Sequence, residues 1–468
     1  MKAKNSSWGR YFPLLIILSA IISACDSSAL SGDDPSGGPG GSQGTGWNKD
    51  QPNNVIFYKT NTGTIISIAP DSIIAYGENE EVANIVSNTY SEEGIGKIVF
   101  DKDLRAIASE AFRRKELTSI SIPSGVTEIG EEAFYKCTSL TSINIPSGVT
   151  EIGRAAFCVC SSLTSIKIPS GVTKIKDFSF EGCTSLTSIN IPSSVTEIGE
   201  EAFYECSSLT SINIPSSVTE IGEEAFYGCT SLTSINIPSS VTEIGEYTFY
   251  ECTSLTSIKI PSGVTKIKDF SFEGCTSLTS INIPSSVTEI GCGAFQRCSS
   301  LTSVIIPSSV TEIGYYAFGY CSSLTSINIP SGVTEIRYQA FISCSSLTSI
   351  SIPSGVTTIG ESAFERCTSL TSIDIPSSVT TIGSSAFYEC SSLTSISIPS
   401  GVTEIGSCAF NECSSLATVT VLAPNPPKCY GATFEKTPCI IYVPSESVDA
   451  YKSAWVWSEY ADRIQPIQ

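Results

Sequence analysis

One interval governs most of this sequence: a proline recurs every 23 residues along about two-thirds of the chain. A phenylalanine and a cysteine keep the same interval, and the cysteine follows the phenylalanine by three residues, from Phe134 and Cys137 to Phe410 and Cys413. The prolines are Pro123, Pro146, Pro169, Pro192, Pro215, Pro238, Pro261, Pro284, Pro307, Pro330, Pro353, Pro376 and Pro399. Self-similarity at such a period is typical of a repeat solenoid, in which each unit packs only against its neighbours.

One unit, residues 140–160, indicates the path of the chain within a repeat. Thr141–Ile145 alternates polar and apolar side chains, which predicts a strand with one face buried. Pro146 ends this strand because it has no N–H, and Val149–Ile152 predicts a second short strand. The stretch up to Cys160 has room for one helical or 3₁₀ turn. We therefore expect a right-handed superhelix whose parallel strands stack about 4.8 Å apart from coil to coil.

The repeated pattern is Leu-x-x-Ile-x-Ile-Pro followed by Val-Thr-x-Ile-Gly-x-x-Ala-Phe-x-x-Cys. It resembles the BspA-like leucine-rich repeats of surface lipoproteins, and the resemblance covers residues 107–421. It implies a secreted or surface protein. Characterised members are mainly adhesins that bind host matrix proteins, host cells or other bacteria.

The two ends of the array do not follow the period, and we interpret them as caps. Residues 47–106 are expected to form a β-rich N-terminal cap, with strands at Val55–Tyr58, Thr64–Ile68 and Lys97–Phe100. Residues 422–468 are expected to form a C-terminal cap, with a strand at Ile440–Pro444 and a helix from Ser445 to Ile464. The helix residues expected to cover the last coil are Val448, Tyr451, Trp455, Tyr460 and Ile464.

The first 24 residues have the layout of a bacterial signal peptide. A positively charged start precedes an apolar run that is too short to span a membrane. The stretch 22–25 resembles a lipobox, which implies lipidation of Cys25. An ordinary signal peptide with an incidental cysteine is the alternative. The glycine-rich residues 25–46 predict a flexible linker. Its Asp26, Asp33 and Asp34 loosely resemble a surface-export signal, so we expect a lipid anchor in the outer membrane and exposure at the cell surface.

Charge and composition exclude several classes of function. The formal net charge is −20, which disfavours binding to nucleic acid or to an anionic membrane surface. The chain contains no histidine, so catalysis by Ser–His–Asp or Cys–His groups is excluded. A row of glutamates at one repeat position, interrupted by Lys174 and Lys266, reads as a solvated face rather than as catalytic carboxylates. We expect neither an enzyme nor a cofactor.

The evenly spaced cysteines pose a separate question, because they suggest disulfides or metal ligands. A ladder with one cysteine per coil lacks the short spacing of metal clusters, and uniform stacking favours no particular disulfide pair. We therefore expect buried free thiols that face backbone carbonyls, as at the corresponding position of leucine-rich repeats. Among the cysteines off the ladder, Cys429 and Cys439 share the C-terminal loop and could form a disulfide.

The outward face of the longer strands is the first candidate binding surface. One variable position, two residues before each repeat proline, is rich in asparagine, and its best candidate patch is Lys167, Asn190, Asn213, Asn236 and Lys259. Stacked asparagine ladders are the structural alternative. A second candidate is the turn side, where Tyr204, Tyr227 and Tyr250 occupy consecutive coils; packing between coils explains them equally well.

Two functions follow from these features. The first is a surface-anchored adhesin or scaffold for host or bacterial surface proteins. The second is a glycan-binding lipoprotein of a nutrient-uptake system. Sugar binding usually needs aromatic platforms, which the sheet face lacks, so the sequence favours the first.

Overall fold

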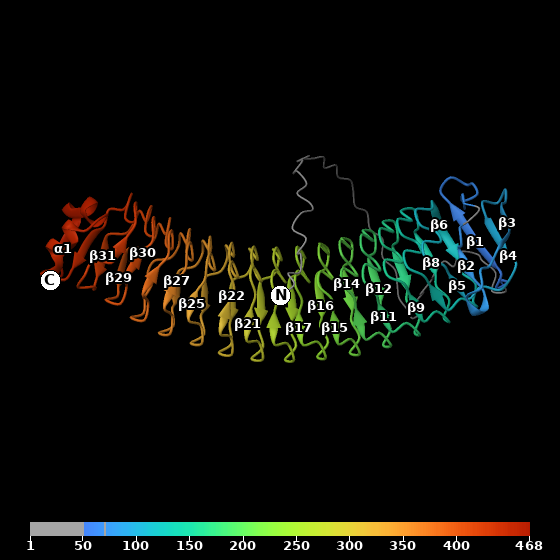
Figure 1. Cartoon of the computed structure of the whole chain (residues 1–468), viewed down its shortest axis with the longest axis horizontal. Helices are drawn as coiled ribbons and strands as arrows, with labels where there is room; N and C mark the ends of the chain where they lie inside the picture. Colours follow the sequence, from blue (N-terminus) through green and yellow to red (C-terminus); the bar gives the residue numbers. More distant parts are fainter. Residues whose placement is uncertain (1–50, 70–71) are drawn as a thin grey trace, which may run out of the picture. The chain divides into compact units, whose positions relative to one another are not determined.

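The structure is a computed structural model, and it describes residues 51–69 and 72–468. The expected signal segment 1–24 and the linker 25–46, including Cys25, lie outside the described residues. In the described part, successive 23-residue units form the coils of one parallel β-solenoid, as predicted from the period (Figure 1).

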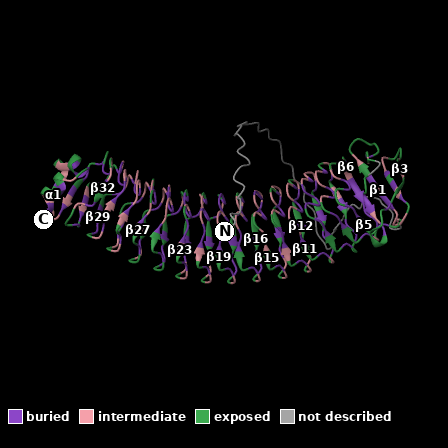
Figure 2. Ribbon diagram, viewed as in Figure 1, coloured by how far each residue is buried: buried purple, intermediate pink, exposed green. Residues whose placement is uncertain are grey.

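Each coil contributes one strand to a long sheet. The central nine strands of this sheet are β10 Ser165–Lys167, β12 Ser188–Asn190, β14 Ser211–Asn213, β16 Ser234–Asn236, β18 Ser257–Lys259, β20 Ser280–Asn282, β22 Ser303–Ile305, β24 Ser326–Asn328 and β26 Ser349–Ser351. Pairing is parallel and in register, so that each residue lies beside its equivalent 23 positions later, as Ile189 lies beside Ile212. Outward and inward residues therefore form continuous rows that follow the curve of the array (Figure 2).

A second, two-residue strand follows in each coil. These strands are β7 Glu128–Ile129, β9 Glu151–Ile152, β11 Lys174–Ile175, β13 Glu197–Ile198, β15 Glu220–Ile221, β17 Glu243–Ile244, β19 Lys266–Ile267, β21 Glu289–Ile290, β23 Glu312–Ile313, β25 Glu335–Ile336, β27 Thr358–Ile359, β28 Thr381–Ile382, β30 Glu404–Ile405 and β32 Lys428–Cys429. The glutamate row lies mostly at the surface, and Lys174 and Lys266 pair within it with Glu197 and Glu289, at 2.5 and 3.0 Å.

The third side of each coil, which we call the turn side, is built from tight turns and not from the expected helical turn. Two residues of most coils, such as Glu201 and Glu205, have positive φ, which interrupts any helix. Alternate backbone N–H groups point to the next coil: Phe203 donates to Ala225 O at 2.9 Å and Glu205 to Tyr227 O at 2.7 Å. A helix would bond these N–H groups to carbonyls within the same coil. Because they bond to the next coil instead, no helical turn forms.

A column of phenylalanine rings runs through the core beneath the turn side. From Phe112 to Phe434 each ring stacks on the equivalent ring of the next coil, with centroids 5.3–5.8 Å apart and planes within 13° of parallel. All of these side chains are fully buried. Such offset stacking contributes about 0.5–1.5 kcal/mol per pair beyond the burial itself.

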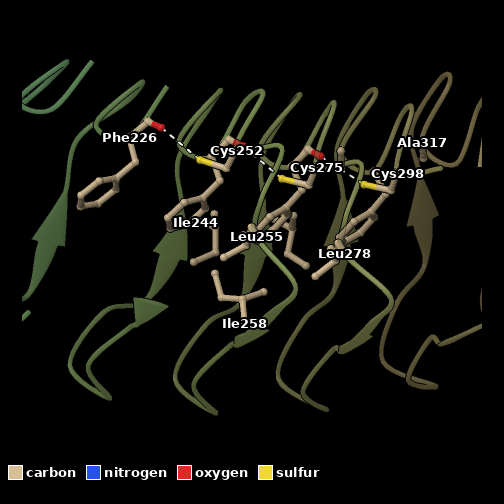
Figure 3. Close-up of a cluster of buried hydrophobic side chains, with 14 of the residues drawn as sticks. Phe226, Ile244, Cys252, Leu255, Ile258, Cys275, Leu278, Cys298 and Ala317 are labelled. Carbon is tan, nitrogen blue, oxygen red and sulfur yellow. Dashed lines mark hydrogen bonds between the residues drawn. The ribbon is translucent and has the colours of Figure 1, made fainter. Parts of the chain in front are cut away.

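Each ladder cysteine joins its own coil to the preceding coil. Each thiol, from Cys137 to Cys413, donates to the backbone carbonyl of the phenylalanine 25 or 26 residues earlier, with Sγ–O distances of 3.0–3.3 Å (Figure 3). Burial raises the pKa of these thiols, for example that of Cys229 to about 12, so they stay protonated donors. The expectation of buried free thiols facing carbonyls is confirmed.

The N-terminal residues close the first coil with antiparallel strands. β1 Val55–Thr60 lies between β4 Gly96–Phe100 and β6 Leu117–Ser121, in a sheet of order β3-β4-β1-β6-β8. The remaining elements of this region are β2 Ala75–Tyr76, η1 Glu78–Glu80, β3 Ile85–Tyr90, β5 Ala106–Ile107 and β8 Ser142–Asn144. The strand expected at Thr64–Ile68 is wrong, because the backbone of Ile66 bonds to side chains of β1 and β3 instead of to a strand.

The C-terminal residues cover the last coil. Its elements are β29 Ser395–Ile398, β31 Thr418–Val421, β33 Ile440–Val443, η2 Ser445–Ser447, α1 Val448–Ser453, η3 Trp457–Arg463 and β34 Ile464–Pro466. The single helix expected from Ser445 to Ile464 is therefore wrong: Val456 has φ 68°, which interrupts it, and Ile464 belongs to a strand.

The side chains that cover this coil also differ from those expected. Tyr451, Tyr460 and Ile464 are buried as predicted, but Trp455 is 73% exposed. Trp457 takes its place beside Phe434, with ring centroids 5.7 Å apart, and donates to Pro427 O at 2.8 Å.

Cys429 and Cys439 remain separate thiols, so the disulfide considered for them is not formed. The Cys429 thiol donates to Thr433 Oγ1 at 3.1 Å, and the Cys439 sulfur lies 3.2 Å from Thr437 Oγ1. Each sulfur thus has a hydroxyl partner of its own.

We predict that, among the cysteines of the described part, only the partly exposed Cys292 and Cys408 react with a maleimide in the native protein. The ladder thiols should react only after denaturation, because they are buried and protonated. Peptide mapping by mass spectrometry after labelling in each state measures this. Disulfides between ladder cysteines in a non-reducing map would contradict it.

Candidate functional site

The predicted sheet-face patch is one continuous row on neighbouring strands. Parallel register places Lys167 of β10 beside Asn190, then Asn213, Asn236 and finally Lys259 of β18. All five side chains are exposed, and at the strand spacing the row spans about 20 Å. The structure therefore brings together every residue of the patch, and its role in binding stays a prediction.

The asparagines of this row are not held by one another. No hydrogen bond joins the side chains of Asn190, Asn213 and Asn236 to each other or to any other described residue. The neighbouring threonine row behaves differently, since Thr210 Oγ1 donates to Thr187 O at 3.3 Å and its equivalents do the same. These amides therefore form an in-register row without hydrogen bonds between them.

A shallow groove borders the row at its C-terminal end. It has a volume of ≈ 470 Å³ and is lined by Asn236, Lys259 and Asn282 together with the repeat prolines of three coils. One position further along the same row is Ile305, which is 76% exposed. The patch predicted from the sequence ends at Lys259, although Asn282 and Ile305 occupy the same repeat position on the next two strands.

The second candidate, the tyrosine column, lies on the turn side. Tyr204, Tyr227 and Tyr250 stack with successive centroids 4.5 Å apart and planes 12° from parallel. A fourth ring, Tyr247, leans against Tyr250 at 5.8 Å and stacks on Phe270 at 5.0 Å. The three rings of the column are half-buried, so packing between coils and exposure to solvent coexist in them.

An acidic groove lies on the short-sheet side of the same coils. Strand pairing is interrupted between β15 and β17, and a groove of ≈ 480 Å³ occupies this place. Glu197, Glu220 and Glu243 line it, and Lys268 reaches Glu243 at 2.9 Å. The repeat pattern does not reveal this groove, because the residues on its two sides are the same as in paired coils.

Across residues 51–69 and 72–468, no group of three or more Cys, Asp or Glu side chains is arranged to hold a metal ion. Within the same residues, no helix is long and apolar enough to cross a bilayer.

Three overlapping stretches, residues 83–210, 196–325 and 311–438, match the model of the BspA type leucine rich repeat region, which comprises six copies. The chain belongs to the BspA-type leucine-rich repeat family. The match agrees with the 23-residue spacing and with the solenoid described above. No curated protein matches the chain.

Solved structures of leucine-rich repeat proteins are similar to it. A leucine-rich repeat protein from Bacteroides ovatus is 30% identical, with a TM-score of 0.59 over 83% of this chain and 99% of that one. A leucine rich cell surface protein from Faecalibacterium prausnitzii is 32% identical over 65% of this chain and 95% of that one, with a TM-score of 0.42.

The turn side of this BspA-type array carries unusual carboxylates next to the tyrosine column. Burial raises the pKa of Glu201 to about 7, and the negative charges of Glu224, Glu181 and Glu200 act in the same direction, against a smaller opposite effect of Arg154. Burial also raises the pKa of Glu224. Arg154 forms its ion pair with Glu131, so neither Glu201 nor Glu224 has an ion-pair partner among the described residues.

We predict that Glu201→Gln stabilises the protein at pH 8 but not at pH 4. The folded-state pKa of Glu201 lies above its unfolded value, so ionisation costs stability progressively as pH rises from about 4.5 through 7. Because the side chain is only partly buried, the gain at pH 8 should be below about 1 kcal/mol. Thermal unfolding at both pH values, with Glu93→Gln as the exposed control, measures it. An equal shift at pH 4 and pH 8 would contradict the account.

Proposed function

We propose that this protein is a surface-exposed adhesin or scaffold that binds proteins of host or bacterial surfaces through the outward face of its long sheet. The observation that supports this most is the row from Lys167 to Lys259, whose exposed amides have no partner within the described residues. Leucine-rich repeat proteins generally bind other proteins. A binding role also fits an array whose rows are regular rather than converging on a catalytic pocket.

The sheet face favours a protein partner over a glycan. Its outward row between β10 and β26 contains no aromatic side chain on which a sugar ring could stack. It does contain the exposed Ile305 beyond the groove, which can serve as an apolar anchor of the kind found at the centre of protein interfaces. The lysines at both edges of the Asn190–Asn236 segment suit an acidic or polar surface on the partner.

Lys167→Glu combined with Lys259→Glu should weaken adhesion at least about tenfold, because like charges then face the partner. Thermal stability should stay unchanged, since both side chains point to solvent. The measurement is binding of the immobilised protein to surface proteins that it captures and that mass spectrometry identifies. Lys97→Glu with Lys452→Glu is the matched control, as both lysines are exposed and lie at opposite ends of the array.

The proposal fails if the Lys167 and Lys259 variant binds as well as its control. If, in addition, Tyr204, Tyr227 and Tyr250 changed to Ser abolish adhesion, the contact face is the turn side.

We further propose that Cys25 carries a lipid that anchors the protein in the outer membrane, with the solenoid displayed outside the cell. The support is the lipobox-like end of the apolar segment and the glycine-rich stretch that follows it. Cys25→Ala should move the protein from the membrane fraction to the soluble fraction. A variant that stays in the membrane fraction, together with an unmodified mass for the wild-type N-terminus, would refute the anchor. Protease treatment of intact cells tests the display.

A further inference from the structure

The tyrosine column presents the edges of its rings to solvent. The rings of Tyr204, Tyr227 and Tyr250 face one another along the array at 4.5 Å, so stacking covers the faces that meet. Both faces of the middle ring, Tyr227, are covered in this way, so its accessible part is its edge. This arrangement makes a flat strip of polarised aromatic edges, two ring spacings or about 9 Å long.

Carboxylates border this strip on both sides. Glu205 and Glu251 follow the outer two tyrosines directly and are exposed, while Glu201 and Glu224 lie three residues before Tyr204 and Tyr227. The charges of Glu205, Glu224 and Glu201 act together with burial to raise the pKa of Tyr204 to about 12, which places these carboxylates near its hydroxyl.

None of these four glutamates forms an ion pair with another described residue, whereas other carboxylates of the turn side do. Glu273 pairs with Arg297 at 3.0 Å, and Glu389 with Arg366 at 3.0 Å. Lys436 pairs with Glu412 at 2.7 Å. At the strip, negative charge therefore lies beside aromatic rings, and none of these four carboxylates has an ion-pair partner among the described residues. Charge complementarity there calls for a cationic partner.

The spacing of the exposed carboxylates further limits the kind of cationic partner that fits. Glu205 and Glu251 belong to coils two apart, and Gly228 stands between them in the middle coil. At Gly228 an added Cβ would lie 3.3 Å from Glu205 Cγ, and at Gly274 one would lie 3.1 Å from Glu251 Cγ, so the two glutamate side chains lie over equivalent glycines two coils apart. Two coils correspond to about 9 Å. A polyproline II helix repeats its side chains on one face every three residues, or about 9.3 Å.

We propose that this strip binds a cationic polypeptide segment in the polyproline II conformation, whose Lys or Arg side chains three residues apart reach Glu205 and Glu251. The tyrosine edges provide the surface on which the prolines between them pack, as aromatic-lined surfaces do for other proline-rich ligands. The site is separate from the sheet-face patch and does not rest on it.

The test is fluorescence titration of the full chain with a labelled peptide of three Lys-Pro-Pro units. Two further peptides serve as controls: three Glu-Pro-Pro units, and a peptide of the same composition with its three lysines consecutive. The proposal expects binding of the first peptide, none of the acidic one, and about tenfold weaker binding of the clustered one. No binding of the Lys-Pro-Pro peptide overturns the site, and equal affinity for the clustered peptide overturns the spacing argument.

Isosteric variants distinguish specific binding at the strip from non-specific attraction of a cationic peptide to an acidic protein. The double variant Glu205→Gln with Glu251→Gln should bind the Lys-Pro-Pro peptide about tenfold more weakly. The control variant Glu92→Gln with Glu93→Gln, which changes exposed residues in the loop before β4, should alter the affinity less than about twofold. Equal loss in both pairs means non-specific charge attraction and overturns the proposal. The Lys167→Glu and Lys259→Glu variant should leave this binding intact, so failure here is distinguishable from failure of the sheet-face proposal.

Discussion

The coils of this protein depend on one repeated arrangement. A phenylalanine ring stacks on the ring of the next coil, and a cysteine thiol donates a hydrogen bond to the phenylalanine carbonyl of the preceding coil (Figure 3). A single unit cannot hold this geometry alone. Ordering 23 residues costs about 1–2 kcal/mol each in backbone entropy, which exceeds what six buried apolar side chains return. Stacking adds the missing contacts on both sides of each coil, so the array is stable only as a whole.

The same contact explains why cysteine suits its position. The thiol is small and apolar enough for a fully buried slot, yet it still donates a hydrogen bond, as Cys252 does to the Phe226 carbonyl that also accepts the N–H of Cys229. Because inward positions are fixed in this way, outward positions are free to differ from coil to coil. The asparagine row with its flanking lysines and the tyrosine column with its unpaired glutamates both occupy such positions, on two different sides of the same coils.

Much of the solenoid could be predicted from the sequence, because with a strict period the structure inferred for one unit applies to every other unit. The in-register repeat accounts for the strand around Ile143, for the burial of the ladder thiols and for the row from Lys167 to Lys259. The period could not predict where it ends. Trp457 rather than Trp455 covers the last coil because Val456 interrupts the helix, and the backbone around Ile66 bonds to side chains instead of forming a strand. The ion pairs could not be predicted from the sequence either, because they depend on which charged side chains lie near each glutamate in the folded protein.

The most direct test of the account is deletion of residues 162–253, which are 92 residues or four units of 23. Residues 162–199 are identical to residues 254–291, so the new junction reproduces a natural one and keeps every ring and thiol in register. If stacking in register determines the fold, this shorter chain unfolds in a single cooperative transition with its remaining ladder thiols protected, whereas deletion of residues 162–241 does not. Equal cooperativity of the two deletions, or failure of the first to fold, would contradict the account.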